Sequence, residues 1–385
     1  MNDTQAKYPQ LRFKGFADPW EERKLGDAVS ISSGVTGDAT LQDGEYRLTR
    51  IESISQGTLN VARLGFTNKK PDQKYLLNLG DILYSNINSL SHIGKVALVD
   101  TTGIYHGINL LRFQMRNDVD SEFLFQRLNT TPMKNWAVSH ANPAVSQASI
   151  NQTELSKQPI SLPTITEQQK IGSFFKQLDK TIALHEEKKR QLERLKSALL
   201  QKMFANKSGY PVVRFEGFSD EWEERKLGDA VSISSGVTGD ATLQDGEYRL
   251  TRIESISQGT LNVARLGFTN KKPDQKYLLN LGDILYSNIN SLSHIGKVAL
   301  VDTTGIYHGI NLLRFQMRND VDSEFLFQRL NTTPMKNWAV SHANPAVSQA
   351  SINQTELSKQ PISLPTITEQ QKIGSFFKQL DKTIA

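Results

Sequence analysis

The sequence predicts an α+β protein that contains two copies of one sheet-rich domain, each copy followed by a long helix. Three observations support this fold class. Residues 20–183 recur without a change as residues 222–385, at a constant shift of 202 positions. Each copy opens with short runs of β-type residues that turn signals separate. Each copy ends in apolar residues with helical spacing.

The first part of the first copy, residues 20–163, predicts a mostly antiparallel, curled sheet with two short helices. Four β-type runs lie at residues 28–32, 46–51, 82–84 and 96–99, and Gly, Asn and Asp punctuate the segments between them. Residues 121–127 and 132–138 are expected to be helical. We interpret this mixture as one α+β domain, which the second copy repeats.

A long helix is predicted to follow this domain. Pro163 cannot lie inside a helix, and Thr166 is expected to cap the N-terminus, with Gln169 completing a capping box. The helix is expected to continue for nearly 40 residues, to about Asn206, and so to span about 60 Å. This length favours a spacer or coiled-coil arm over a surface helix packed on its own domain. Its apolar stripe consists of Ile171, Phe175, Leu178, Ile182, His185, Leu192, Leu195, Leu199 and Met203.

The second copy of the helix suggests how the two copies are related. Residues 368–385 repeat its beginning and stop about 20 residues short of the first helix. Two such helices running antiparallel would relate the copies by a two-fold axis, and duplex DNA is a ligand with that symmetry. The apolar residues Leu192, Leu195 and Leu199 then need a different cover. Another subunit, the segment before Trp20, or a trimmed end of the second helix are the three alternatives.

Composition excludes several classes of protein. The 385 residues include 45 Lys and Arg against 40 Asp and Glu, a net charge of +5 that permits phosphate binding without proving it. The chain has no cysteine, which excludes disulfides, thiolate catalysis and cysteine-bound zinc and fits a cytoplasmic location. No apolar run is long enough for a membrane span, and the first residues do not resemble a signal peptide.

Catalytic motifs are also missing. Gly94-Lys95 is followed by Val96 and has no upstream glycine, so it is not a phosphate-binding loop. Asn142-Pro143-Ala144-Val145 lacks the second proline and the aromatic residue of the motif found in adenine methyltransferases. The seven histidines do not have the spacing of a metal site. We therefore expect no catalytic residue and no bound metal.

Linked motifs resemble one protein family over essentially the whole chain. They are Trp20-Glu21 with Lys24-Leu25-Gly26-Asp27, the Gly80-Asp81-Ile82-Leu83-Tyr84 segment, Leu162-Pro163 followed by Glu167-Gln168, and the helix that ends in Leu199-Leu200-Gln201-Lys202-Met203-Phe204. Each motif alone is weak, but their order, with most of them occurring twice, resembles the specificity subunits of type I restriction–modification systems.

This resemblance implies an organisation for the chain. Residues 1–163 would hold a first target recognition domain with an N-terminal segment, and residues 164–206 the first spacer helix. Residues 207–365 would form the second target recognition domain, and residues 366–385 a short second spacer helix. The two spacer helices of this family form an antiparallel coiled coil. The two domains each bind one half of a bipartite DNA site.

The resemblance also implies partners and cofactors. A specificity subunit is not an enzyme and binds no cofactor itself. It binds double-stranded DNA and assembles with two methyltransferase subunits, which use S-adenosylmethionine to methylate adenine at N6, and with motor and nuclease subunits. Because the two recognition domains are identical here, we expect a palindromic, interrupted target. Tethering two readers makes the second binding event intramolecular, so both half-sites are required.

Two polar segments of each copy, residues 85–95 and 139–149, are candidates for base contacts. Asn and Gln can pair with adenine, and Ser can bind bases or phosphates, although such segments are also typical of ordinary solvated loops. Basic residues, including Arg112, are candidates for phosphate contacts or simple surface charges. The candidate DNA-binding residues in the first copy are Arg47, Arg50, Lys69, Lys70, Lys74, Ser85, Asn86, Asn88, Ser91, His92, Lys95, His140, Asn142, Ser146, Gln147 and Ser149.

The same positions recur in the second copy. They are Arg249, Arg252, Lys271, Lys272, Lys276, Ser287, Asn288, Asn290, Ser293, His294, Lys297, His342, Asn344, Ser348, Gln349 and Ser351. The start of each helix, with Glu167, Gln168, Ile171, Phe174 and Phe175 in the first copy, is expected to bind protein or to pack on its own domain. A stand-alone DNA-binding repressor or scaffold remains the competing hypothesis, and a nuclease or methyltransferase is the third.

Overall fold

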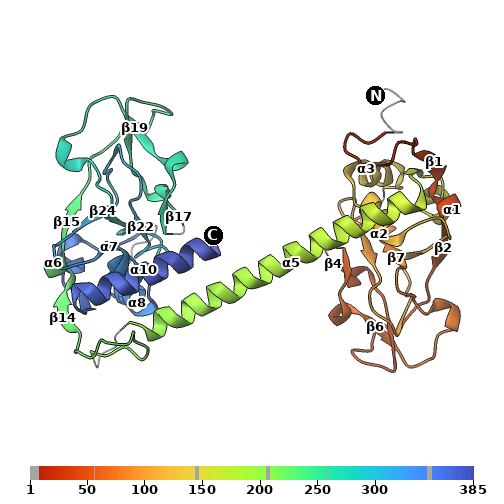
Figure 1. The fold of residues 1–385 in the computed structure, drawn as a ribbon, viewed down its shortest axis with the longest axis horizontal. Helices are drawn as coiled ribbons and strands as arrows, with labels where there is room; N and C mark the ends of the chain where they lie inside the picture. The colour runs from red at the N-terminus through yellow and green to blue at the C-terminus, as the bar shows by residue number, and fades with distance from the viewer. Residues whose placement is uncertain (1–7, 56, 144–146, 205–208, 258, 345–348) are drawn as a thin grey trace. The chain divides into compact units, whose positions relative to one another are not determined.

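A mostly antiparallel sheet forms the centre of each copy. The computed structural model describes residues 8–55, 57–143, 147–204, 209–257, 259–344 and 349–385. The contacts divide the chain into two units, Met1–Leu184 and His185–Ala385, so the division falls inside the longest helix. Figure 1 shows each unit as a layer of strands with helices along one side.

The elements of the first unit follow the predicted order. Its strands are β1 (Glu21–Lys24), β2 (Val29–Ser33), β3 (Tyr46–Leu48), β4 (Ile54–Ser55), β5 (Thr58–Leu59), β6 (Gly65–Thr67), β7 (Ile82–Tyr84), β8 (Ile87–Asn88), β9 (Val96–Leu98), β10 (Ile104–Tyr105), β11 (Leu111–Met115), β12 (Ala148–Ser149) and β13 (Pro159–Leu162). Its helices are α1 (Leu25–Ala28), α2 (Ser121–Leu128), α3 (Thr131–His140), α4 (Gln152–Leu155) and the start of α5 (Ile165–Lys202), with short 3-10 turns at Ile51–Ser53, Val61–Arg63 and Gln73–Tyr75.

The central sheet of the first unit has the strand order β2-β11-β7-β9-β5-β4 and is antiparallel except between β5 and β9. Its middle strand, β7, is buried on both faces. Ile82 and Tyr84 face the main core with α2 and α3, whereas Leu83 faces a smaller core on the other side. This alternation follows from the two-residue period of a strand and explains why the whole run is apolar.

A smaller sheet, β10-β3-β6, lies beyond the second core. Tyr46–Leu48 pairs antiparallel with Gly65–Thr67 and parallel with Ile104–Tyr105. The predicted strand at residues 46–51 is therefore shorter than expected, because the chain turns into a 3-10 helix at Ile51. The predictions of strands at residues 82–84 and 96–99 and of helices at residues 121–127 and 132–138 are confirmed to within about two residues.

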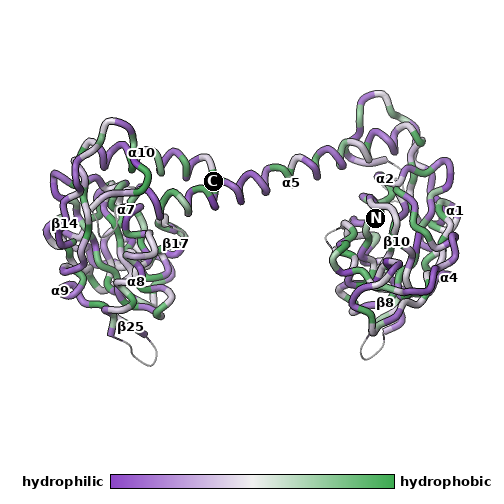
Figure 2. Tube along the Cα trace, turned by 90° about the horizontal axis from the view of Figure 1, so that it is seen from below, coloured by the Kyte–Doolittle hydropathy of each residue, from purple (hydrophilic) through white to green (hydrophobic). Residues whose placement is uncertain are grey.

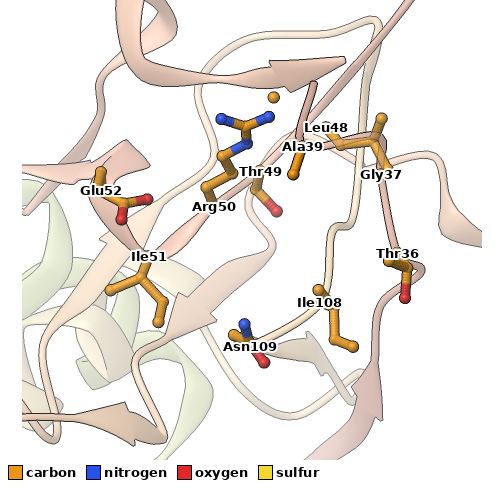
Figure 3. Close-up of a pocket in the computed structure, with 11 residues that line it drawn as sticks. Thr36, Gly37, Ala39, Leu48, Thr49, Arg50, Ile51, Glu52, Ile108 and Asn109 are labelled. Carbon is orange, nitrogen blue, oxygen red and sulfur yellow. The ribbon is translucent and has the colours of Figure 1, made fainter. Parts of the chain in front are cut away.

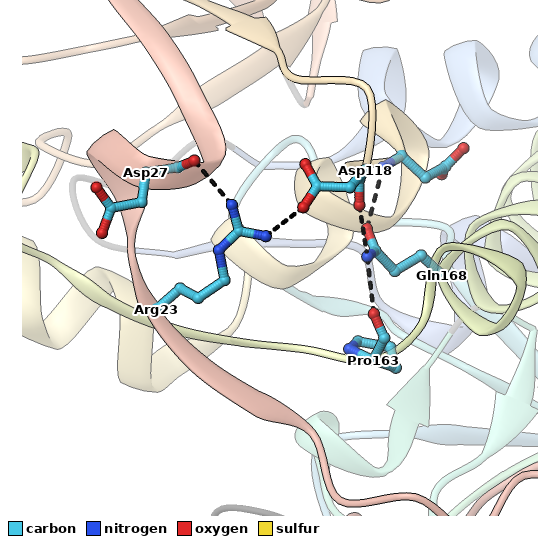
Figure 4. Close-up of polar contacts among 6 residues, drawn as sticks. Arg23, Asp27, Asp118, Pro163 and Gln168 are labelled. Atoms are coloured by element: carbon cyan, nitrogen blue, oxygen red, sulfur yellow. Dashed lines mark hydrogen bonds and ion pairs between the residues drawn. The ribbon is translucent and has the colours of Figure 1, made fainter.

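Polar side chains fix the start of α5 to its own domain (Figure 4). The Gln168 amide accepts from the Asp120 backbone N–H at 3.0 Å and donates to the carbonyls of Asp118 at 3.1 Å and Pro163 at 2.9 Å. Arg23 joins the same cluster, because it donates to the Asp118 carboxylate at 2.5 Å and to the Asp27 carbonyl at 2.8 Å. These contacts fasten the first turn of α5 to its own domain.

The prediction of Thr166 as the helix cap was wrong. The helix begins at Ile165, and the Thr164 hydroxyl accepts from the Glu167 N–H at 3.4 Å. Glu167 is fully buried, and Arg12 holds its carboxylate with two hydrogen bonds of 2.7 Å. Glu167 and Gln168 therefore fasten the helix to its own domain, which leaves them no surface for a partner.

The length of α5 confirms the predicted long helix, because it has 38 residues. Figure 2 shows hydrophobic and hydrophilic residues alternating along its tube. Only Glu167, Gln168 and Gly172 are buried within it. Gly172 allows the close approach to α2, since a Cβ there would lie 2.7 Å from the Asp120 carboxylate.

The second unit repeats the fold. Its strands are β14 (Glu223–Lys226), β15 (Val231–Ser235), β16 (Tyr248–Leu250), β17 (Ile256–Ser257), β18 (Thr260–Leu261), β19 (Gly267–Thr269), β20 (Ile284–Tyr286), β21 (Ile289–Asn290), β22 (Val298–Leu300), β23 (Ile306–Tyr307), β24 (Leu313–Met317), β25 (Ala350–Ser351) and β26 (Pro361–Leu364). Its helices are α6 (Leu227–Ala230), α7 (Ser323–Leu330), α8 (Thr333–His342), α9 (Gln354–Leu357) and α10 (Ile367–Ile384), with 3-10 turns at Ile253–Ser255, Val263–Arg265 and Gln275–Tyr277.

The end of α5 packs against this second unit. Met203 and Phe204 are buried in its main core, and Leu199 and Leu200 pack against that core. Packing of Leu199 against the core of the second unit was not among the three alternatives expected from the sequence. Leu195, by contrast, is half exposed. No helix within the described ranges is both long and apolar enough to cross a membrane.

Candidate nucleic-acid interface

The two polar segments that the sequence singled out lie side by side in the first unit. β8 pairs antiparallel with β12, so that Asn88 lies opposite Ala148 and Ile87 opposite Ser149. Ser149 also exchanges two backbone hydrogen bonds with Asn142, of 2.7 and 3.1 Å. Residues 85–95, 142–143 and 147–149 therefore form one small surface, which we call the polar ribbon. Of the candidate residues, Ser146 and Ser348 lie outside the described residues.

The inner residues of the polar ribbon support it. Ser85 is buried, and its hydroxyl accepts from the Asn88 amide at 3.2 Å. The Asn86 amide donates to the Ile150 carbonyl at 3.2 Å, while its side-chain oxygen is buried with no partner. Ser85 and Asn86 thus hold the two segments together and are poorly placed to reach a duplex directly.

The outer residues of the polar ribbon are exposed. Ser91, His92, Lys95 and Gln147 all present their side chains to solvent. The His92 ring nitrogen Nδ1 lies 2.6 Å from the Ser89 hydroxyl and 3.1 Å from the Ser91 hydroxyl, so this turn is ordered by its own side chains. Exposed amide, hydroxyl, imidazole and ammonium groups on one surface are the chemistry that reads bases and binds phosphates.

Helix α3 lies beneath this turn and contributes to the same surface. Gly94 has a positive φ of 79°, and a Cβ there would lie 3.4 Å from the Ala137 side chain and 3.9 Å from the Lys134 Cα. His140, at the end of α3, stacks on Trp136 with ring centroids 4.0 Å apart. The ribbon is therefore supported by a helix, which gives its exposed groups a defined position.

Lys134 and its copy Lys336, on this helix, were not among the residues predicted from the sequence. Burial lowers the pKa of Lys336, and repulsion from Lys297 and Lys196 lowers it further. Lys297 is the copy of Lys95, so the two lysines contribute to one basic field. No local sequence signal identifies this lysine, because only the fold brings Lys134 under Gly94.

The other basic candidates gather elsewhere, around the small sheet. Arg50 forms one wall of a hollow of about 360 Å³, with Glu52 and Asn109 also at its edge (Figure 3). Gly65 makes room for Arg50, since a Cβ there would lie 2.2 Å from the Arg50 Nε. This hollow recurs in the second unit around Arg252 with about 350 Å³.

Four more basic candidates lie on or near the small sheet. Arg47 is on β3, and Lys69 and Lys70 follow β6 in an exposed turn. The Lys74 ammonium lies 3.8 Å from the Asp72 carboxylate and 5.0 Å from the Tyr75 ring centroid, and both charged side chains remain largely exposed. The structure thus divides the candidates into two groups, the polar ribbon and the basic rim of the small sheet.

Arg112 was wrong as a candidate phosphate contact. Its side chain is 3% exposed and lies against the second core, where it pairs with Asp81 at 2.5 and 2.7 Å. It also donates to the Lys74 carbonyl at 3.0 Å. Leu111 and Phe113 face the main core, so the two-residue period of β11 puts Arg112 on the opposite, equally buried face.

The second unit carries the same two groups of residues. Asn344 bridges to Ser351, the Asn288 amide donates to the Ile352 carbonyl at 3.2 Å, and His294 lies 2.6 Å from the Ser291 hydroxyl. Arg314 pairs with Asp283 at 2.6 Å, as Arg112 does with Asp81. The second unit therefore repeats the contacts of the first at both groups of residues.

The helix residues expected to bind a partner differ between the two copies. Phe174 contacts Phe13 with ring centroids 5.8 Å apart, and Phe376 contacts Phe215 in the same manner. Phe175, however, is 38% exposed, whereas Phe377 is fully buried. The expectation that some of these residues pack on their own domain is thus met by Phe174.

Comparison with known proteins identifies the family. The model of the type I restriction modification DNA specificity domain matches residues 17–194 and again residues 219–385. The chain belongs to the type I restriction–modification specificity family. This membership, shown twice along the chain, confirms the predicted resemblance and the two-copy organisation of the fold.

Relatives and solved structures agree with this family. A protein named as the specificity subunit of the type I restriction enzyme MjaX in Methanocaldococcus jannaschii is 27% identical over 383 residues, covering 95% of this chain and 88% of that protein. The crystal structure of a type I restriction–modification S subunit from M. genitalium is similar with a TM-score of 0.60 and 17% identity, covering 98% of this chain and 92% of the other. A chain from a study of complex assembly in the type I restriction–modification system has a TM-score of 0.54 at 15% identity, with the same coverage. The α+β fold of a specificity subunit is thereby confirmed.

Proposed function

We propose that this specificity-family chain binds a bipartite DNA site whose two halves are inverted repeats, with one half-site for each copy. The observation that carries the proposal is the repetition of the whole polar ribbon, contact by contact, in two units of identical sequence. Two domains of identical sequence would recognise identical half-sites. A two-fold relation between the units would present those half-sites as inverted repeats on the duplex.

The chemistry of the two groups of residues supports a division of labour within each unit. Gln147, Ser91 and His92 on the polar ribbon would contact base edges, because amide, hydroxyl and imidazole groups form directed hydrogen bonds. Lys69, Lys70 and Arg47 around the small sheet would contact phosphates, which position the protein without reading sequence.

Linking the two recognition domains provides a sequence selectivity that one domain alone lacks. A mismatched base pair costs roughly 1–3 kcal/mol, so a half-site of a few base pairs discriminates weakly by itself. When α5 links two readers, the second contact becomes intramolecular, and both half-sites are needed for tight binding. Since DNA turns once in about 10–10.5 base pairs, a fixed helical link would also reject targets with the wrong gap.

The proposal includes catalytic partners but no catalysis by this chain. In the described part of the chain, no group of three or more potential metal ligands lies together. We propose that two methyltransferase subunits bind the helices and transfer the methyl group of S-adenosylmethionine to adenine N6, and that motor and nuclease subunits join them. The purified chain would then fix where these partners act.

The test is a selection of bound sequences from a library of random duplexes, with the purified chain alone and with its methyltransferase subunits, at one fixed salt concentration. The proposal expects an enriched motif with two inverted half-sites and one preferred gap in the presence of the subunits. Enrichment of a single half-site without a preferred gap would overturn the bipartite part of the proposal. Equally tight and selective binding by the chain alone would favour the stand-alone binder.

A further inference from the structure

A large apolar side chain stands exposed on the polar ribbon. Leu90 is 46% exposed, and its copy Leu292 in the second unit is 47% exposed. Leu90 was not among the residues predicted from the sequence to contact DNA, because a leucine is by type a core residue. Its exposure in both copies shows that the fold keeps this side chain out of the core.

An ordered turn presents Leu90 to solvent. The Ser89 carbonyl accepts from the backbone N–H groups of His92 at 2.8 Å and of Ile93 at 3.0 Å. The Ser89 hydroxyl lies 2.6 Å from Nδ1 of His92. Ile93 is 3% exposed and belongs to the main core of the unit. Ile93 therefore anchors the turn, and its hydrogen bonds give the exposed Leu90 a defined position.

The neighbours of Leu90 distinguish it from other exposed apolar residues. Single apolar residues are common on protein surfaces, and Leu79 is 62% exposed as well. Leu79 precedes β7, however, whereas the polar ribbon follows β7, so the two leucines lie beyond opposite ends of this strand. Leu90 stands between Ser89 and Ser91 and next to the His92 ring, among groups that form directed hydrogen bonds.

The shape of the polar ribbon indicates which groove of DNA it fits. β8 and β12 form a separate two-stranded antiparallel sheet, and Leu90 lies in the turn that follows β8. The major groove of B-DNA admits a two-stranded ribbon of this kind. Base edges in that groove present hydrogen-bond donors and acceptors, and thymine adds its C5 methyl group. This methyl group is the apolar feature that a leucine can recognise there.

We propose that Leu90 contacts the C5 methyl group of a thymine in the major groove, and that Leu292 does the same in the second half-site. Each half-site therefore requires a T·A pair at one position. The serine and histidine side chains beside the leucine bind polar atoms of the neighbouring base edges. This inference rests on the proposed function, since it assigns one base contact to the polar ribbon.

The experiment compares duplexes that differ by one methyl group in each half-site. The probes carry the motif selected in the presence of the methyltransferase subunits, with deoxyuridine in place of one thymine position at a time. Deoxyuridine pairs as thymine does and lacks only the C5 methyl group. Fluorescence anisotropy at one fixed salt concentration measures binding by the assembled complex. We expect one position at which the replacement weakens binding by about 4-fold for each half-site.

Matched variants separate recognition of the methyl group from a structural role. Leu90→Ala with Leu292→Ala should weaken binding of the thymine duplex and bind the deoxyuridine duplex equally well. Leu90→Met with Leu292→Met keeps an apolar contact and should retain the discrimination. Leu79→Ala with Leu281→Ala replaces leucines that are 62% and 63% exposed away from the polar ribbon, and should leave both affinities unchanged. A purely structural role of Leu90 would weaken both duplexes by the same factor and keep their ratio.

Three results would overturn the proposal. One is discrimination between thymine and deoxyuridine that survives Leu90→Ala with Leu292→Ala. Another is a selected motif in which no thymine responds to loss of its methyl group. The third is a bend in the duplex that disappears in the alanine variant with equal loss of affinity for both duplexes, because the leucine would then be a wedge between base pairs. The proposed function fails earlier, at the selection, if the motif has a single half-site or unequal halves, and the thymine test still applies to the bases selected.

Discussion

Arg112 and Lys95 carry the same charge but have opposite environments, and this contrast governs what single residues contribute. Arg112 is buried beside Asp81 and stabilises the fold, whereas Lys95 lies on the exposed polar ribbon. Nothing in the residue type separates the two. The neighbours do, because Arg112 stands between the buried Leu111 and Phe113.

A first prediction concerns this buried pair. Arg112→Met removes the partner of Asp81 and leaves a buried carboxylate uncompensated, which costs about 3–5 kcal/mol of unfolding free energy. The double variant Arg112→Met with Asp81→Asn should lose less unfolding free energy, because no buried charge remains. Urea unfolding of both variants measures this difference. Equal losses of unfolding free energy in the two variants would show that Arg112 does not stabilise the Asp81 carboxylate.

His106 and its copy His308 predict a dependence of stability on pH. Each is buried and hydrogen-bonded to a backbone carbonyl through Nε2 at 3.0 Å, and burial lowers the pKa of each to about 4. The unfolded chain binds these protons below about pH 6.5, so stability is full above that pH and falls towards pH 4. Each histidine accounts for about 3 kcal/mol at most.

Thermal melting between pH 4 and pH 7 tests this prediction. The double variant His106→Gln and His308→Gln keeps a side-chain donor and removes the titrating group, so its melting temperature should change less over this range. A variant with the same pH profile as the original chain would assign the acid sensitivity to other groups.

Gln147 and Gln349 predict an effect on sequence preference. Both are exposed on the polar ribbon, and a bidentate amide contact with a base contributes about 1–3 kcal/mol of discrimination. Gln147→Ala with Gln349→Ala should relax the bound motif at one position in each half-site and leave the circular dichroism spectrum unchanged. Gln191→Ala, an exposed glutamine on α5, is the control. An unchanged motif would remove these glutamines from the interface.

At the scale of elements, periodicity predicted most of the fold. The apolar stripe of α5 and the β-type run of β7 identified both elements by their spacing, although β7 is buried whereas Phe175, Leu178 and Ile182 of the stripe are exposed. The N-cap of α5 was predicted at Thr166 but lies at Thr164. Both residues carry the same hydroxyl, and only the backbone conformation determines which of them caps the helix. The docking of Phe204 on the second unit could not be predicted, because it depends on a contact between distant segments.

That contact gives an element-scale prediction. Phe204→Ala leaves a cavity between α7, α10 and Trp222 and should cost the second unit about 3–5 kcal/mol. Hydrogen exchange should quicken in α7 and α10. It should stay unchanged in α2 and the start of α5, which are sequence copies without this occupant. Equal acceleration in both units would mean that Phe204 acts on the chain as a whole.

For the whole molecule, the duplication was evident from the sequence, and so was the family that it resembles. The two polar segments were also found there, because their residue types are unusual for a core. Their pairing through β8 and β12, and the separation of the basic residues into a second group, required the fold. Two units of identical sequence that repeat the polar ribbon lead us to propose that both halves of the DNA target are the same.

A genome-wide map of N6-methyladenine, made in cells that contain this chain and its methyltransferase subunits, tests that claim most directly. We expect one bipartite motif whose halves are inverted repeats separated by a constant gap. A motif with two different halves would contradict it, because identical readers would then be recognising different sequences.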